Sequence, residues 1–285
     1  MYRVLAIAAL LAALVSGRAL ADDCKFSEQR DFDVDAASLK TLALDLGASD
    51  ATIEGVAGLT KVEVRGRICA SSKEGLAPFQ VEHKREGDRL IVTARHESSA
   101  VNISIGGVRY AGLKLAVRMP RDLALKVDAA AGDVDVSSVA SLDFKSSAGD
   151  LKLNDIAGAV VLDLAAGDVE GGGLGSLEVK RAAAGDIKLH DVHGDARLAG
   201  ISAGDLHLDK VGGSVEIGNI DTGDVRLGQI AHDVRVQSLG TGDLDVDGVG
   251  GDLVVRSHGL GDITHRNVRG KVEVPRDSMG EDSDD

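Results

Sequence analysis

The sequence predicts an all-β protein whose larger part is a parallel β-solenoid, with two short strands in each coil of 17–19 residues. Three observations lead to this prediction. A Gly-Asp pair recurs at a nearly constant interval, aliphatic residues recur at fixed offsets from each pair, and the residues between those aliphatics are polar. A less regular β-rich segment precedes the repeat and completes the predicted architecture.

The Gly-Asp pair marks one corner of every coil. Its successive glycines are 17, 18, 18, 19, 19, 19 and 19 residues apart. A repeat of this length buries its apolar side chains only by stacking on its neighbours. Glycine suits a corner that needs a positive φ or a close backbone approach. The eight pairs are Gly132 and Asp133, Gly149 and Asp150, Gly167 and Asp168, Gly185 and Asp186, Gly204 and Asp205, Gly223 and Asp224, Gly242 and Asp243, and Gly261 and Asp262.

Aliphatic residues recur at fixed distances from these glycines. The position two past each glycine is always aliphatic, the position four past it is so except at Gly171 and His265, and the position seven past it is always Val, Ile or Leu. Spacing by two indicates a strand with one buried face, and the third position fits an inward-pointing corner. The second half of the coil repeats the spacing in pairs such as Leu177 and Val179. We therefore expect two parallel sheets around a thin aliphatic core.

The residues between the inward pairs should face solvent. On the first strand of each coil, and on part of the second, their charges alternate in sign over much of the length, as expected for coils that stack about 4.8 Å apart. Both faces are therefore predicted to be solvated exteriors. The first row is Asp135, Lys152, Glu170, Lys188, His207, Arg226, Asp245 and Thr264, and the second contains Glu178, Arg197, Glu216 and Arg235.

The recurring aspartates need a compensating interaction, because carboxylates about 5 Å apart repel by about 1 kcal/mol per neighbour even in water. One explanation is an Asx-type turn, in which each carboxylate accepts backbone N–H groups at its own corner. The other is calcium held between coils. Calcium-binding β-rolls carry an aspartate in every nine residues, whereas this chain has one per coil, so the turn is favoured and calcium remains the alternative.

The two ends of the chain differ from the repeat. Residues 1–21 fit a secretory signal peptide, with Arg3, an apolar run from Val4 to Val15 and the small residues Ala19 and Ala21 before the cleavage point. Cleavage would change the net charge from −14 to −16, since it removes two arginines and no acid. We therefore expect an exported protein without direct membrane insertion that does not bind nucleic acid by electrostatics. Residues 276–285 are predicted to be a disordered acidic tail.

Between these ends we place a β-rich N-terminal segment at 22–127 and the regular solenoid at 128–275. The N-terminal segment includes a degenerate coil, with Ala51, Ile53 and Val56 at the repeat offsets followed by Val62 and Val64. It also includes a hairpin around Gly87. We expect it to cover one open end of the solenoid. Its two cysteines, Cys24 and Cys69, are predicted to form a disulfide, because an exported chain with an even cysteine count usually pairs them.

No residue set in the sequence points to catalysis or to a cofactor. The densest group of possible ligands is the stretch 190–195, with His190, Asp191, His193 and Asp195, which either forms a solvated turn or contributes to a metal site; a closed site needs three or four convergent ligands. A Gly-x-Ser-x-Gly nucleophile motif is absent. Equivalent aspartate corners do not provide the unlike acid and base of a glycosidase. The chain has no Trp, two Tyr and four Phe, which disfavours a carbohydrate groove built on ring stacking.

One stretch carries a family resemblance. Residues 115–127, which read as a strand, a turn at Pro120 and a second strand, lead into Ala-Gly-Asp-Val-Asp-Val and its recurrences. This pattern resembles the bacterial putative adhesin family of exported β-solenoid proteins over residues 40–275. This chain has Ala, Thr or Leu260 where Ser is usual before Gly-Asp. The resemblance implies adhesion and brings no catalytic residues.

The function expected from the sequence is a non-enzymatic, exported scaffold or adhesin-like protein, periplasmic or at the cell surface, that presents its β faces to a protein or a surface polymer. A periplasmic envelope-stress or signalling accessory is the main alternative. An enzyme acting on polysaccharide is a more distant one.

Overall fold

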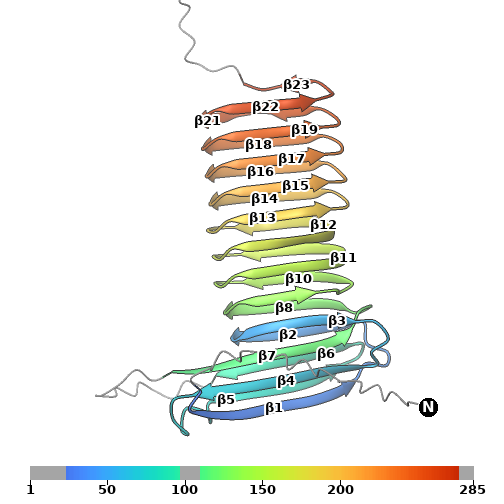
Figure 1. Ribbon diagram of the computed structural model, residues 1–285, viewed down its shortest axis with the longest axis vertical. Coiled ribbons are helices and arrows are strands. Elements are labelled where there is room, and N and C mark those ends of the chain that lie inside the picture. Colours follow the sequence, from blue (N-terminus) through green and yellow to red (C-terminus); the bar gives the residue numbers. More distant parts are fainter. Residues whose placement is uncertain (1–23, 97–109, 276–285) are drawn as a thin grey trace, which may run out of the picture.

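A computed structural model describes residues 24–96 and 110–275, in which all regular secondary structure is β-strand. The coils stack into one tall column (Figure 1). The predicted signal peptide and the acidic tail lie outside these residues, as does the stretch with Val101, Ile103 and Ile105, whose alternation predicts a strand. Nothing within them forms a helix capable of crossing a membrane.

The N-terminal strands have 7–10 residues, and those of the repeat have 2–8 residues except for two strands of 14 residues that run through both halves of a coil. The N-terminal strands are β1 (Phe26–Asp35), β2 (Thr41–Ala48), β3 (Asp50–Val56), β4 (Lys61–Ala70), β5 (Phe79–Glu86), β6 (Arg89–His96), β7 (Ala111–Pro120) and β8 (Ala124–Ala131). The repeat contains β9 (Val134–Ser137), β10 (Ser141–Ser146), β11 (Leu151–Leu164), β12 (Val169–Ala182), β13 (Ile187–Val192), β14 (Ala196–Ala203), β15 (Leu206–Val211), β16 (Val215–Thr222), β17 (Val225–Ile230), β18 (Val234–Thr241), β19 (Leu244–Val249), β20 (Leu253–Val255), β21 (His258–Leu260), β22 (Ile263–Val268) and β23 (Val272–Glu273).

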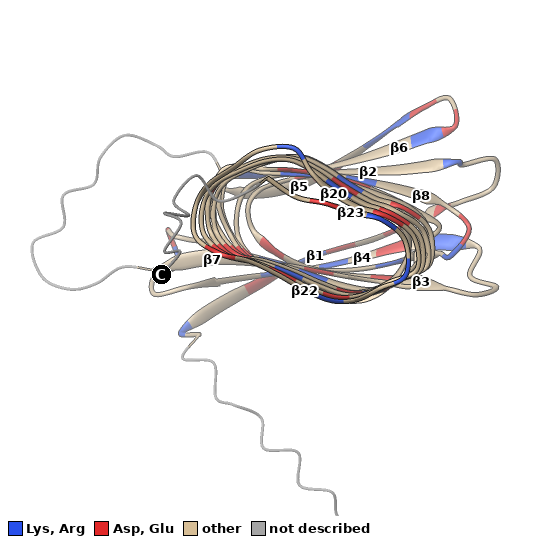
Figure 2. Ribbon diagram, turned by 90° about the horizontal axis from the view of Figure 1, so that it is seen from above, with Lys and Arg blue, Asp and Glu red and all other residues tan. Residues whose placement is uncertain are grey.

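The pairing of these strands produces two faces. The first sheet runs β1-β4-β7-β3-β9, then the first halves of β11 and β12, then β13-β15-β17-β19-β22. The second sheet runs β5-β6-β2-β8-β10, then the second halves of β11 and β12, then β14-β16-β18, followed by β20, β21 and β23. Viewed along the stack, the coils superimpose as a flattened ring with the sheets on its long sides (Figure 2).

The register repeats from coil to coil, as the aliphatic columns predicted. Leu151 pairs with Val169, and Val169 pairs with Ile187. Their side chains are buried and belong to one continuous hydrophobic core that extends from Leu39 to Val255. Burial of this apolar surface provides the main driving force for stacking the coils. The predicted parallel β-solenoid is therefore confirmed.

In every coil, the residue just before the third inward position, seven past the corner glycine, has a left-handed backbone conformation. The sequence pattern did not reveal this feature. All eight residues six positions past the corner glycines have φ between 54° and 81°, and only two of them are glycine. This conformation turns the chain between the two sheets. The column is Ser138, Asp155, Gly173, Asp191, Lys210, Gln229, Gly248 and Asn267.

The N-terminal strands extend both sheets and end them with antiparallel strands. β1, β4 and β7 pair antiparallel on the first sheet, and β5 and β6 form the predicted hairpin on the second. The rings of Phe32 in β1 and His83 in β5 stack with centroids 4.5 Å apart, which links the two sheet edges. The predicted degenerate coil differs in one half. It consists of β2 and β3, whereas Val62 and Val64 lie in antiparallel β4, because the second half of that coil precedes β3 in the chain.

The C-terminal coil has no further coil of the described chain above it. Ile263 and Val268 at its inward positions are only partly buried, and His265 is exposed where earlier coils carry an aliphatic residue. Leu260 is 68% exposed. This end of the column is therefore less apolar and less tightly covered than its centre.

Candidate functional site

The eight recurrent aspartates form a hydrogen-bonded ladder, which we call the first aspartate ladder. The Oδ1 atoms of the first seven, Asp133 to Asp243, each accept the backbone N–H of the aspartate one coil later, at 2.8–3.1 Å, and the Asp133 N–H donates to Asp50 Oδ1 at 3.2 Å. We predicted hydrogen bonds within each corner, and the bonds instead run between coils. Parallel stacking in register places each N–H directly beside the preceding carboxylate, which makes the intercoil bond available.

The other carboxylate oxygen of two ladder residues, Asp186 and Asp224, pairs with a cation. Asp186 Oδ2 lies 2.8 Å from Lys188 Nζ, and Asp224 Oδ2 lies 3.3 Å from Arg226 Nη2. These cations occupy the outward row two residues after the aspartate. At such corners one oxygen accepts a hydrogen bond from the neighbouring coil and the other forms an ion pair within the coil, which offsets the repulsion between stacked carboxylates.

A second ladder lies at the corner that leads into the second sheet. Asp195 Oδ1 accepts the Ser214 N–H, Ser214 Oγ accepts the Asp233 N–H, and Asp233 Oδ1 accepts the Asp252 N–H, at 2.9–3.4 Å. Asp252 Oδ1 then accepts the Lys271 N–H at 2.8 Å. Sequence reasoning missed this ladder. The constant 19-residue spacing was the available signal, but Ser214 interrupts the aspartates and the earlier coils lack them.

The ladder contacts lower the pKa values of three carboxyl groups. The pKa of Asp186 is lowered by the hydrogen bond from Lys188 and then by the N–H of Asp205. The pKa of Asp195 is lowered chiefly by the Ser214 N–H and further by Arg197, and that of Asp233 by the Asp252 N–H and then by Arg235. Hydrogen bonds and nearby positive charge both favour the ionised carboxylate.

The glycine of each Gly-Asp pair permits the close stacking at this corner. These eight residues have φ between 102° and 138°. A Cβ at Gly223 would lie 2.0 Å from the carbonyl oxygen of Gly204, and the same contact recurs along the column at 2.0–2.2 Å from Gly149 onward, except beside Gly132, where it is made with Ser49 at 2.6 Å. The corner therefore excludes a side chain on conformational and on steric grounds.

The residues proposed as metal ligands do not converge. His190 Nδ1 lies 2.8 Å from Asp191 Oδ2, whereas His193 Nδ1 lies 3.0 Å from the carbonyl oxygen of Leu174 in the preceding coil. Across the described ranges, no three His, Cys, Asp or Glu side chains are arranged to hold a metal ion. Calcium between the coils would have to compete with the backbone hydrogen bonds of the ladder.

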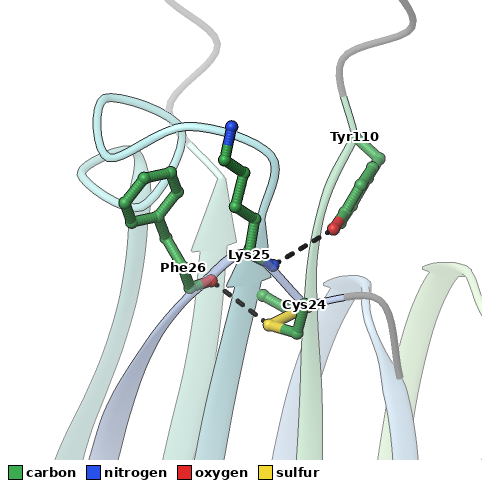
Figure 3. The surroundings of a disulfide bond; sticks show 5 residues. Cys24, Lys25, Phe26 and Tyr110 are labelled. Carbon is green, nitrogen blue, oxygen red and sulfur yellow. Dashed lines mark hydrogen bonds between the residues drawn. A yellow bond between two sulfur atoms is a disulfide. The ribbon is translucent and has the colours of Figure 1, made fainter. Parts of the chain in front are cut away.

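Cys24 and Cys69 form a disulfide, with their Cα atoms 5.4 Å apart (Figure 3). It joins the residue just before β1 to β4, beside the antiparallel pair of Phe26 with Ala70. The Lys25 N–H donates to the Tyr110 hydroxyl at 3.4 Å, so the start of the described chain also contacts the segment that enters β7. The bond fixes the N-terminal end of the first sheet.

Comparison with known families identifies the chain. The sequence profile of the family described as Toastrack DUF4097 matches residues 65–281. The chain belongs to the Toastrack DUF4097 family. Among curated proteins, the search found no match.

Several solved structures are similar to this Toastrack chain. One is described as a putative adhesin from Bacteroides fragilis, with 12% identity, 87% of this chain and 97% of that chain covered, and a TM-score of 0.35. Another is a putative cell adhesion protein from Clostridium sporogenes, with 11% identity, coverage of 87% and 100%, and a TM-score of 0.29. A third is a putative lipid binding protein from Parabacteroides distasonis, with 15% identity, coverage of 86% and 96%, and a TM-score of 0.40.

Proposed function

We propose that this Toastrack protein is a non-enzymatic, exported scaffold that uses the outer faces of its solenoid to hold a partner protein or a surface polymer. The main support is the construction of those faces. Their backbone groups are paired along the sheets, their inward side chains are buried, and their outward side chains form continuous polar rows. Such faces offer a regular and rigid contact surface, as solenoid proteins commonly do.

The arrangement of the functional groups supports a non-enzymatic role. The aspartates that recur along the column are engaged with backbone N–H groups in equivalent environments, so they do not divide into an acid and a base. His190 and His193, the two histidines closest in sequence, contact different partners. The disulfide supports an oxidising compartment outside the cytoplasm.

Capture from envelope fractions tests the scaffold role. The chain from Asp22 onward would be immobilised beside two variants, one with Lys152, Glu170 and Lys188 all changed to Gln, and one with Arg197, Glu216 and Arg235 all changed to Gln. These residues lie on the outer faces of the first and the second sheet respectively. We expect one variant to lose the captured partner while the other keeps it. Equal capture by the wild type and both folded variants would contradict binding through a face.

Export is tested separately by fusing residues 1–30 to a reporter enzyme that becomes active only outside the cytoplasm. We expect reporter activity, and its absence would contradict export through this segment. The melting temperature with and without calcium tests the ion-binding alternative, which requires a rise when calcium is added.

A further inference from the structure

The outer face of the second sheet carries a shallow hollow of about 540 Å³ across β12, β14, β16, β18 and β20. It exists because two successive coils, at Ala199 and Gly218, present almost no side chain outward. A Cβ at Gly218 would lie 2.1 Å from the carbonyl oxygen of Ala199, so the stacking itself excludes a larger residue there. Lys180 lines one end of the hollow, and Gln237 and Arg256 line the other.

The hollow is rich in cations although the protein is strongly acidic. Its lining includes four basic side chains and two acidic ones, in a chain whose net charge is −14. The basic residues are Lys180, Arg197, Arg235 and Arg256, and the acidic ones are Glu178 and Glu216. A bound anion would therefore meet a locally positive surface on a molecule that otherwise repels it.

These cations are not all neutralised by the protein. Arg197 pairs with Asp195 at 2.8 Å and with Glu216 at 3.4 Å, and Arg235 pairs with Asp233 at 2.7 Å. Lys180 and Arg256, at the two ends, have no carboxylate partner in the part of the chain that the structure describes. Each arginine retains further N–H donors after its ion pairs, since a guanidinium has five.

The spacing of the cations follows the stack of coils. Arg197 pairs in register with Glu216 and Glu216 with Arg235, so the two arginines are two coils, or about 10 Å, apart along the axis. Lys180 and Arg256 are separated by four coils, or about 19 Å. The basic groups thus lie in two neighbouring outward rows along the solenoid, Arg197 and Arg235 in one and Lys180 and Arg256 in the other, an arrangement suited to an extended ligand with repeated negative charges.

We propose that this hollow binds a linear acidic polysaccharide, a polyuronate-type chain lying along the solenoid axis with its carboxylates on Lys180, Arg197, Arg235 and Arg256. This proposal builds on the proposed scaffold function and specifies both the face and the class of surface polymer. No aromatic residue lines the hollow. The sugar chain is therefore recognised by its charge, which removes the objection that scarce aromatics raise against a neutral carbohydrate.

The chemistry of the face favours this ligand over an acidic peptide or an anionic membrane. Extended peptides usually bind by adding a strand to a sheet edge, but the backbone below the hollow is already paired on both sides. A flat anionic membrane would also approach the second ladder, where Asp195 and Asp233 lie two residues before Arg197 and Arg235. A thin chain would lie over fewer of those carboxylates than a flat membrane would.

Calorimetric titration of the protein from Asp22 onward with polygalacturonate oligomers tests the proposal, with dextran as the neutral control. Two variants at one exposed position, Ala199→Glu and Ala199→Gln, have side chains of nearly equal size and differ in charge. We expect Ala199→Glu to bind polygalacturonate about tenfold more weakly than Ala199→Gln. The double variant Lys180→Gln/Arg256→Gln should weaken binding by a similar factor. The double variant Lys188→Gln/Arg226→Gln, altered on the first sheet, should bind as the wild type does.

Binding should also weaken as salt is added, because the contacts are ionic. Failure of the wild type to bind polygalacturonate would overturn this inference while leaving the scaffold function to the capture experiment. Equal affinities of the two Ala199 variants would show that the ligand lies elsewhere, and would also overturn it. Tighter binding to polyglutamate or to anionic vesicles than to polygalacturonate would reject the choice of a polysaccharide.

Discussion

At the scale of single residues, the aspartate of each Gly-Asp pair connects two coils. Its Oδ1 accepts a backbone N–H from the next coil, and at Asp186 and Asp224 its Oδ2 pairs with a cation of the same coil. A charged acceptor forms a stronger hydrogen bond than a neutral one. The residue therefore contributes through its geometry as well as its charge, and these two contributions can be separated by substitution.

Asp205 offers that separation. Asp205→Ala removes the acceptor of the Asp224 N–H and should lower the free energy of unfolding by about 1–3 kcal/mol. Asp205→Asn keeps an acceptor oxygen and reduces repulsion along the ladder, so its effect should stay within about 0.5 kcal/mol. Urea unfolding followed by circular dichroism measures both. An equal decrease in the free energy of unfolding of the two variants would show that the carboxylate charge, and not the hydrogen bond, stabilises the stacked coils.

Lys210 tests the left-handed column. Its φ is 57°, a conformation that costs L-residues about 1–2 kcal/mol and that glycine adopts freely. Its ion pair with Asp191 spans 3.7 Å at the surface and contributes little. Lys210→Gly should therefore raise the free energy of unfolding by about 0.5–1 kcal/mol. Lys210→Ala loses the same charge but keeps the strained φ, so its free energy of unfolding should not rise. A rise in both variants would contradict strain at φ as the cause.

The residue scale also shows where sequence reasoning reaches its limit. The inward columns were predictable, since burial demands an aliphatic residue in every coil. The left-handed column was not, because a solvated corner tolerates residues as different as Ser138, Lys210 and Asn267 at a modest cost. The partners of the aspartate carboxylates were also not predictable. They depend on which backbone N–H lies beside each carboxylate once the coils are stacked, and the sequence pattern does not specify this.

At the scale of the coil, the glycine corner sets how closely successive turns approach. In Gly223→Ala the new Cβ would lie 2.0 Å from the Gly204 carbonyl oxygen at a φ of 135°. The coil of Gly204 or that of Gly223 would have to shift, and this would break hydrogen bonds of the first aspartate ladder to the coils above and below. We expect Gly223→Ala to lower the free energy of unfolding, measured by thermal unfolding, by about 3 kcal/mol or more.

Gly87→Ala provides the control for that substitution. Gly87 lies in the β5–β6 hairpin turn with φ 62°, and a Cβ there would meet nothing within 4 Å. Gly87→Ala should lower the free energy of unfolding only by the cost of the strained φ, about 1 kcal/mol. A similar loss in the two variants would show that φ alone, without the close approach of the coils, determines the need for glycine.

Acid should loosen the coils through the ladders. The pKa values of Asp186, Asp195 and Asp233 are lower in the folded protein than in the unfolded chain, so the folded state holds fewer protons at these sites. Their stabilising contribution is complete above their unfolded value of about 4 and is lost as the pH falls through the folded values. The melting temperature should therefore drop from about pH 5 downward.

Asp233→Asn makes this acid dependence specific. The variant keeps an acceptor for the Asp252 N–H but cannot be protonated and does not pair with Arg235 as a carboxylate. The range from about pH 5 to about pH 3 brackets the ordinary Asp pKa of about 4. Over this range, the melting temperature of the variant should change less than that of the wild type. Asp221→Asn, at an exposed position off the ladders, should leave the slope unchanged, and an identical slope in all three proteins would contradict the ladder explanation.

At the scale of the whole molecule, the column has two unlike ends. The N-terminal end closes with antiparallel strands, the Phe32–His83 stack and a disulfide, while the C-terminal coil is followed by no other coil of the described chain. Stability in a solenoid is close to a sum of terms for each coil and its neighbours. A change at one end should therefore act on that end and fade along the stack.

Removal of the disulfide tests this locality. The bond closes a loop with a sequence separation of 45, and disulfides of this kind stabilise by about 2–4 kcal/mol. In Cys24→Ser/Cys69→Ser, hydrogen exchange should accelerate in β1 and β4 while β14, β16 and β18 keep their protection, since those coils retain all their neighbours. A reductant should have the same effect on the wild type and none on the variant. Uniform acceleration along the whole column would show instead that the N-terminal strands and the coils unfold as one cooperative unit, so that the antiparallel end holds the entire solenoid together.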